Sequence, residues 1–118
     1  MEKNKKEENL KFKTFEDLEI YKKEREFRKK IYALINKLPP EEKYNLDPQM
    51  RKAVVSITNN IAEGHGRYHY QENIQFCRQA RGSLEKIIDN LNVCLDEKYF
   101  SYEYINGLKE MVLIFLKN

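Results

Sequence analysis

Between positions 74 and 95, apolar residues recur every three or four residues at seven successive positions. Ile74, Cys77, Ala80, Leu84, Ile87, Leu91 and Cys94 make up this series, with Arg81, Ile88 and Leu95 beside it. An α-helix brings residues at this spacing to one face, whereas a strand would need strict alternation. The spacing therefore predicts one long amphipathic helix over about 70–97, and its apolar face needs other helices to cover it.

Three further stretches show the same spacing, and each is bounded by helix-starting or helix-breaking residues. Thr14 is a predicted N-cap for the first helix, which should end before Pro39. Asp47, followed by Pro48, is the predicted N-cap of the second, and Ser101 that of the last. The apolar series are Ile20, Phe27, Ile31, Leu34 and Leu38; Met50, Val54, Ile57 and Ile61; and Ile105, Leu108, Val112 and Phe115.

Four amphipathic helices with short connections predict an all-α, up-and-down antiparallel four-helix bundle. A chain of 118 residues is enough for one domain, so we expect a single bundle over 13–118. Residues 1–12 mix Lys, Glu and Asn and predict a flexible, charged N-terminal arm. No apolar run reaches the roughly 20 residues of a membrane span, so we expect a cytoplasmic protein without membrane contact.

Several residues within or next to the predicted helices need a separate explanation. Glu24 lies on the apolar stripe of the first helix, so either that turn is solvated or Glu24 has a partner. Gly82 lies in the middle of the third helix, where it indicates a neighbour packed too close for a side chain. Gly64 and Gly66 are expected to stop the second helix with a sharp turn. Cys77 and Cys94 are about 25 Å apart on one helix and are predicted to be reduced core thiols.

Positive charge is concentrated in the middle of the chain. Residues 51–81 carry five Lys/Arg against two Asp/Glu, and the whole chain has a formal charge of +3. Arginine suits bidentate contacts to phosphate or carboxylate groups. The predicted nucleic-acid or anion-binding residues are therefore Arg51, Lys52, Arg67, Arg78 and Arg81.

The segment that follows Gly66 interleaves cationic and aromatic residues. Tyr68 and Tyr70 are expected in an interface between copies of the chain, with stacking on unpaired bases as the alternative. His65 and His69 lie four residues apart, but Gly66 separates them and no third ligand is near in sequence. We therefore predict turn histidines and no metal site.

Two glycine-containing motifs make the sequence recognisable. Residues 60–67 (NIAEGHGR) and 80–84 (ARGSL), with 15–21, 49–57 and 68–76, resemble bacterial four-helix-bundle proteins first noticed in 23S rRNA intervening sequences. The resemblance spans roughly Phe12 to Phe115. Three positions differ from the usual pattern: Thr58 replaces a common proline, His65 a common phenylalanine and Glu24 a usual alanine.

The resemblance implies assembly into a ring-shaped homo-oligomer, a pentamer. The biochemical role of that family is largely unassigned. The family is also similar to the accessory protein of diversity-generating retroelements, a basic ring that binds nucleic acid and a reverse transcriptase. From this resemblance we expect the chain to bind nucleic acid (RNA or DNA), a reverse transcriptase or another protein.

Small and polar residues of the two motifs are the predicted oligomer contacts or structural polar network. Glu63 is expected to meet Arg81 between helices, with Arg81 to Glu85 as the rival pair. The predicted contact residues are Asn60, Glu63, Tyr68, Tyr70, Ala80, Gly82 and Ser83.

No catalytic motif is recognisable, so we predict neither an enzyme nor a cofactor. Two functions remain open on the sequence. One is a nucleic-acid-binding accessory protein that acts through the basic surface of the assembled ring. The other is a homo-oligomeric scaffold, or protein-interaction module, that binds no nucleic acid.

Overall fold

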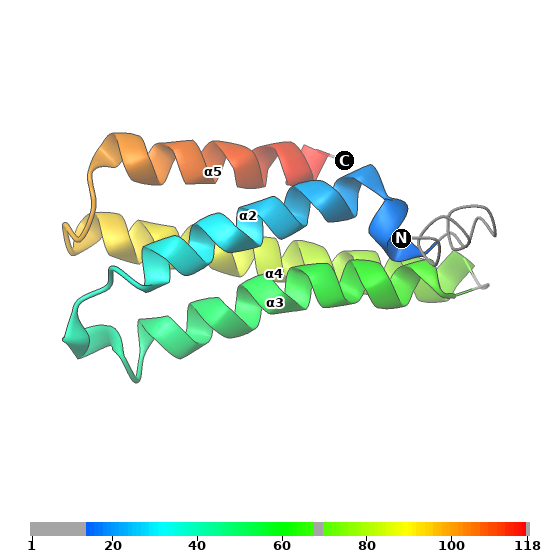
Figure 1. Ribbon diagram of the computed structural model, residues 1–118, viewed down its shortest axis with the longest axis horizontal. Coiled ribbons are helices and arrows are strands. Elements are labelled where there is room, and N and C mark those ends of the chain that lie inside the picture. Colours follow the sequence, from blue (N-terminus) through cyan, green and yellow to red (C-terminus); the bar gives the residue numbers. More distant parts are fainter. Residues whose placement is uncertain (1–13, 68–69, 118) are drawn as a thin grey trace, which may run out of the picture.

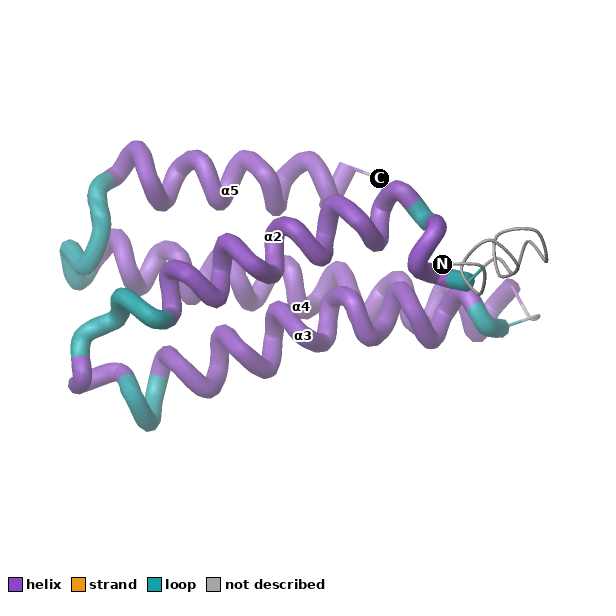
Figure 2. Tube along the Cα trace, in the orientation of Figure 1, coloured by secondary structure: helices purple, strands orange, loops and turns teal. Residues whose placement is uncertain are grey.

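The computed structural model describes residues 14–67 and 70–117, and every regular element within those ranges is helical. Four α-helices follow one another: α2 (Glu19–Ile35), α3 (Leu46–His65), α4 (Tyr70–Asp96) and α5 (Tyr102–Lys117). Each runs antiparallel to the one before it (Figure 1), and loops and two 3-10 helices, η1 (Phe15–Asp17) and η2 (Pro40–Glu42), complete the chain (Figure 2). The predicted all-α bundle is confirmed for these residues.

The predicted apolar stripes meet in one core. Phe27 of α2 packs edge-on against Phe115 of α5, with ring centroids 5.6 Å apart. This contact joins α2 to α5, two helices that contact each other less extensively than consecutive helices do. Fully buried members from all four helices are Phe27, Ile31, Leu34, Met50, Ile57, Ile87, Leu91, Cys94, Ile105 and Val112.

The start of α5 and the end of α2 agree with the predicted helix-starting and helix-breaking residues, whereas the starts of α2 and α3 do not. Ser101 caps α5, because its hydroxyl accepts a hydrogen bond from the Tyr104 amide at 3.2 Å. α2 ends at Ile35, before Pro39, as predicted. Thr14 does accept a hydrogen bond from the Glu16 amide, but it caps the short η1 helix, and α2 begins only after the extended residue Leu18.

The predicted start of α3 is wrong by two residues. The helix begins at Leu46, and the Glu42 carboxylate accepts a hydrogen bond from the Leu46 amide at 3.3 Å. A carboxylate from the preceding η2 turn thus satisfies the helix end that we assigned to Asp47. The hydroxyl of Tyr99 donates to the same Glu42 carboxylate at 2.6 Å, which ties the α4–α5 connection to this turn.

Gly66 caps the end of α3 as predicted, whereas Gly64 is not part of that turn. Gly64 lies inside α3, where an added Cβ would stand 3.1 Å from the Cβ of Phe76 in α4. Gly64 therefore permits close approach of two helices. An added Cβ at Gly82 would meet no described atom within 4 Å, so the predicted close neighbour is wrong within the subunit.

One cysteine prediction is also wrong. Cys94 is a buried core thiol, whereas Cys77 is exposed near the start of α4. Both thiols are free. No helix within residues 14–67 and 70–117 has the length and apolar character that a membrane span requires.

Candidate nucleic-acid interface

The solvent face of α2 is more basic than the composition of this helix indicates. α2 carries six cations, Lys22, Lys23, Arg25, Arg28, Lys29 and Lys30, and three acids, Glu19, Glu24 and Glu26. Glu24 is only 3% exposed, and burial raises the pKa of its carboxyl group to about 8. At neutral pH this group is mostly uncharged and faces the interior. The exposed face therefore holds six cations against two acids.

Two of these cations lie along the side of α2 that packs on α3. Arg28 donates a hydrogen bond to the Thr58 hydroxyl of α3 at 2.8 Å. Arg25 is exposed one turn earlier, three residues away on the same helical face. We define the basic seam as Arg25 and Arg28 of α2 with Arg51 and Lys52 of α3.

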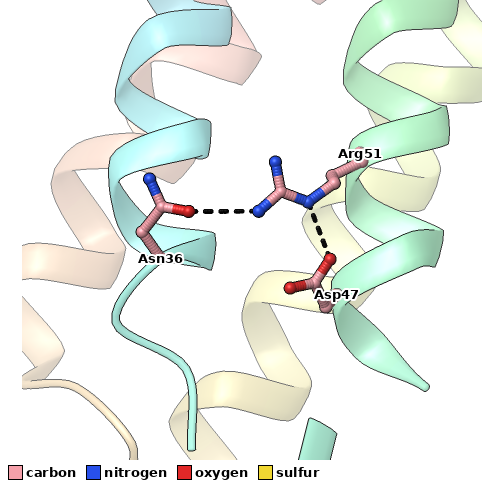
Figure 3. A network of polar contacts seen from close by, with 3 residues as sticks. All are labelled: Asn36, Asp47 and Arg51. Carbon is pink, nitrogen blue, oxygen red and sulfur yellow. Dashed lines mark hydrogen bonds and ion pairs between the residues drawn. The ribbon is translucent and has the colours of Figure 1, made fainter. Parts of the chain in front are cut away.

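Arg51 is held in place by three contacts, one within α3 and two to α2 and its C-cap residue. Its Nε donates to Asp47 at 2.7 Å, and its Nη2 donates to the Asn36 side chain at 3.1 Å (Figure 3). Its guanidinium also lies over the Tyr32 ring, 5.1 Å from the centroid. The hydrogen bond from Arg51 to Asp47 raises the pKa of the guanidinium, so its charge is permanent. Arg51 thus joins α2 to α3, and any anion must share it with Asp47.

A shallow polar hollow of about 520 Å³ lies beside Arg51 on α3. Asn60 donates to the Ser56 carbonyl at 2.8 Å and to the Ser56 hydroxyl at 3.0 Å. Ser83 of α4 donates to the same hydroxyl at 3.0 Å. Predicted network residues Asn60 and Ser83 are therefore brought together through Ser56. The hollow is lined by Tyr32, Arg51, Lys52, Val55, Ser56, Asn59, Asn60 and Glu63.

The predicted Glu63 to Arg81 contact is wrong. Glu63 pairs with Arg67, 3.7 Å away on the next turn. Arg81 instead donates a hydrogen bond to the Leu116 carbonyl of α5, so it lies on the α5 side of α4. The rival pair with Glu85 is not formed among the described residues. Spacing in sequence could not reveal this, because the carbonyl at the end of α5 is 35 residues away.

The five predicted anion-binding residues do not form one patch in a single subunit. Arg51 and Lys52 line the hollow on α3, whereas Arg81 lines a separate cavity that reaches α5. Arg67 lies near Glu63 and Glu72 and over the Phe76 ring. Arg78 is exposed on α4. In one subunit these residues present several separate charges.

The remaining predicted contact residues divide similarly. Ala80 is buried inside the bundle, away from the surface that a contact between copies would use. Gly82 is exposed. Tyr68 and His69 lie outside the described residues, and Tyr70 is described only as the first residue of α4. Among the described residues, no group of three His, Cys, Asp or Glu side chains is placed to hold a metal ion.

Arg25 and Arg28 were missing from the predicted site. In the sequence the acids Glu19, Glu24 and Glu26 offset the positive charge of this helix, but Glu24 is buried. The signal was present, because Glu24 lies four residues after Ile20 and three before Phe27, on the apolar stripe. A charged residue at a core position removes its charge from the surface.

Comparison with family models matches residues 16–116 to the family described as 23S rRNA-intervening sequence protein. The matched range runs from η1 to the last turn of α5 and so includes all four helices. A search of curated proteins found no match.

Proposed function

Because the chain belongs to the 23S rRNA-intervening sequence protein family, we propose that it is a non-catalytic, homo-oligomeric nucleic-acid-binding accessory protein. RNA or DNA would bind through the basic surface of the assembled ring. The ring itself, a pentamer, is part of the proposal. It rests on the sequence resemblance and on the exposed apolar side chains described below.

The burial of Glu24 is the observation that carries this proposal. With that carboxyl group inside, the solvent face of α2 has a surplus of four positive charges, six cations against Glu19 and Glu26. Arg25 has no acidic partner among the described residues, and Arg28 uses a neutral hydroxyl. Phosphate groups would meet arginines whose charge is not already neutralised.

Assembly would multiply this modest charge. Leu113 and Ile114 of α5 are 50% and 58% exposed, and Tyr102 at the start of the helix is 62% exposed. Apolar side chains on the outer face of a helix are a common feature of contacts between copies. Several subunits that present the same basic seam to one strand would bind with much higher apparent affinity than one subunit does.

Titration of labelled single-stranded RNA and duplex DNA at two salt concentrations tests this function. Binding should be tight at low salt and should weaken steeply as salt rises, because neutralised phosphates release counterions. The ratio of the two affinities would also identify the preferred nucleic acid. Absence of binding to both at low salt would refute the proposal.

The exposed apolar face of α5 also favours the second candidate, a homo-oligomeric scaffold or protein-interaction module. In that function Leu113 and Ile114 would bind a partner protein, and a reverse transcriptase is the one that the resemblance suggests. Replacing Leu113 with Asp should then abolish partner capture, and neither wild type nor variant should bind RNA in a salt-sensitive manner. Salt-sensitive RNA binding by the wild type would favour the first function.

A further inference from the structure

A second cavity, of about 460 Å³, is lined by residues from the start of α2 and the end of α5. Figure 1 shows that these two helix ends lie at the same end of the bundle. All four helices contribute to the cavity, and its volume falls within the range of about 300–1,000 Å³ that is usual for small-molecule sites. We call it the end cavity. It is lined by Glu19, Ile20, Lys23, Glu24, Ile61, Cys77, Ala80, Arg81, Leu84, Ile114 and Phe115.

Glu24 supplies an unused polar group to this cavity. The side chain is 97% buried, since only 3% of its surface is exposed, and its Oε1 atom has no hydrogen-bond partner among the described residues. Buried polar atoms in folded proteins nearly always have a partner. An unpartnered carboxyl oxygen at the wall of a cavity therefore indicates a ligand that completes it.

The charges around the cavity determine what that ligand carries. Lys23 and Arg81 both line it, and neither has an acidic partner within salt-bridge distance among the described residues. Arg81 uses one nitrogen to bind the Leu116 carbonyl, which leaves its other N–H groups free. The one exposed acid at the cavity, Glu19, lies 3.7 Å from Lys22. These cations oppose an amine as the partner of Glu24 and favour an anionic ligand.

The other walls of the cavity are largely apolar. They include Ile61 of α3, Leu84 of α4 and Phe115 of α5. The Phe115 ring packs edge-on against Phe27, which fixes its position. Such walls suit a flat ring with apolar faces. The ligand that combines flat faces, a hydrogen-bonding edge and a negative charge is a nucleobase with its phosphate.

We propose that the end cavity takes one unpaired nucleobase, with Glu24 hydrogen-bonded to the base edge and Arg81 and Lys23 in contact with the phosphate. The inference rests on the proposed nucleic-acid function and names the part of the ligand that this cavity recognises. A free nucleotide and a single strand share this chemistry. The raised pKa of Glu24 supports it, because a protonated carboxyl group donates and accepts side by side, as the pairing edge of a base does.

Cys77 provides the test, because it lines the cavity and is exposed, whereas Cys94 is buried. The rate of its alkylation by N-ethylmaleimide is measured with and without nucleoside monophosphates or a short single-stranded RNA. Both ligands, or the RNA alone, should slow the reaction, and the two arms distinguish a free nucleotide from a strand. Cys77→Ser should remove the labelled product and so identify the reacting thiol.

Two variants connect protection to the cavity. Glu24→Leu keeps an apolar interior but removes the hydrogen-bonding group, and it should abolish protection in a protein with unchanged circular dichroism. Arg81→Gln should raise the ligand concentration needed for protection about tenfold, as expected for the loss of one charge-assisted hydrogen bond. If Glu24→Leu fails to fold, the Arg81 variant alone decides.

The outcomes separate this inference from the proposed function. RNA binding by the protein without protection of Cys77 would overturn the inference and leave the function standing. Protection by monophosphates without RNA binding would support the inference and overturn the function. The inference would be overturned if Glu24→Leu left the protection of Cys77 intact. It would also be overturned if Cys77 did not react before any ligand was added, because another chain would then cover the cavity.

Discussion

Glu24 should make the stability of this protein fall as the pH rises from mildly acidic to neutral. Burial raises the pKa of its carboxyl group from 4.5 to about 8. The unfolded chain therefore releases this proton first, and the folded state binds more protons throughout that interval. Stability is greatest below pH 4.5 as far as this group is concerned, and it decreases as the pH approaches 8.

The size of the effect follows from the same two values. Each pH unit between them weakens folding by about 1.4 kcal/mol. At pH 7 the ionisable carboxyl group should therefore destabilise the fold by about 3 kcal/mol relative to its protonated form. That is a large fraction of the roughly 5–15 kcal/mol by which a domain of this size is usually stable.

Urea denaturation of the wild type and Glu24→Gln at a series of pH values from 4 to 8.5, at one protein concentration, measures this effect. Glutamine is similar in shape and cannot ionise, so its profile should lack the decline. Glu26→Gln is the matched control. Glu26 is exposed on the same helix, 3.4 Å from Lys29, and an exposed pair contributes at most about 1 kcal/mol. Parallel profiles for wild type and Glu24→Gln would refute the reasoning.

Three further substitutions test other parts of the structure. Gly64→Ala should lower the free energy of unfolding by about 1–3 kcal/mol, because the added Cβ would press on Phe76. Gly82→Ala should raise it by up to about 1 kcal/mol, because nothing lies within 4 Å of the added Cβ and alanine favours the helix. Equal effects of the two substitutions in thermal melts would contradict this account. Arg51→Met should destabilise the fold by about 1 kcal/mol in urea, because Asp47 and Asn36 lose their partner but remain accessible to water. Exposed Lys52→Met should change stability little. Tyr99→Phe removes the hydrogen bond that lowers the pKa of Glu42 most, so that pKa should rise toward its ordinary value in an NMR titration. An unchanged titration midpoint would count against the hydrogen bond, and exposed Tyr102→Phe is the control.

The fold was predictable because helix periodicity and chain-breaking residues are local signals. Apolar spacing located the core face of each helix, and Ser101 marked the start of α5 to within a residue. The start of α3 was missed because its first amide is bonded by Glu42, a residue of the preceding turn that is itself held by the Tyr99 hydroxyl of the α4–α5 connection. Such partners cannot be found from spacing.

The candidate site was predicted less well, for a related reason. A sequence shows which residues are charged but not which way each one faces. Glu24 was expected to be solvated or to have a partner, and it is buried with one oxygen unpartnered. Arg81 was assigned to Glu63 and binds the end of α5, and Cys77 was assigned to the core and is exposed. All three residues line the cavity at one end of the bundle. Periodicity assumes that a helical face is covered along its whole length, whereas the α4 face is exposed at Cys77 and Arg81.

The most direct test of the central claim is the salt dependence of single-stranded RNA binding by wild type and Arg25→Gln. The plot of log affinity against log salt should become shallower by about 0.7 for each Arg25 that contacts a phosphate. Lys86→Gln, which removes an equal charge from an exposed position on α4, should leave the slope near that of wild type. Equal slopes for wild type and Arg25→Gln would contradict the claim that the basic seam binds the strand.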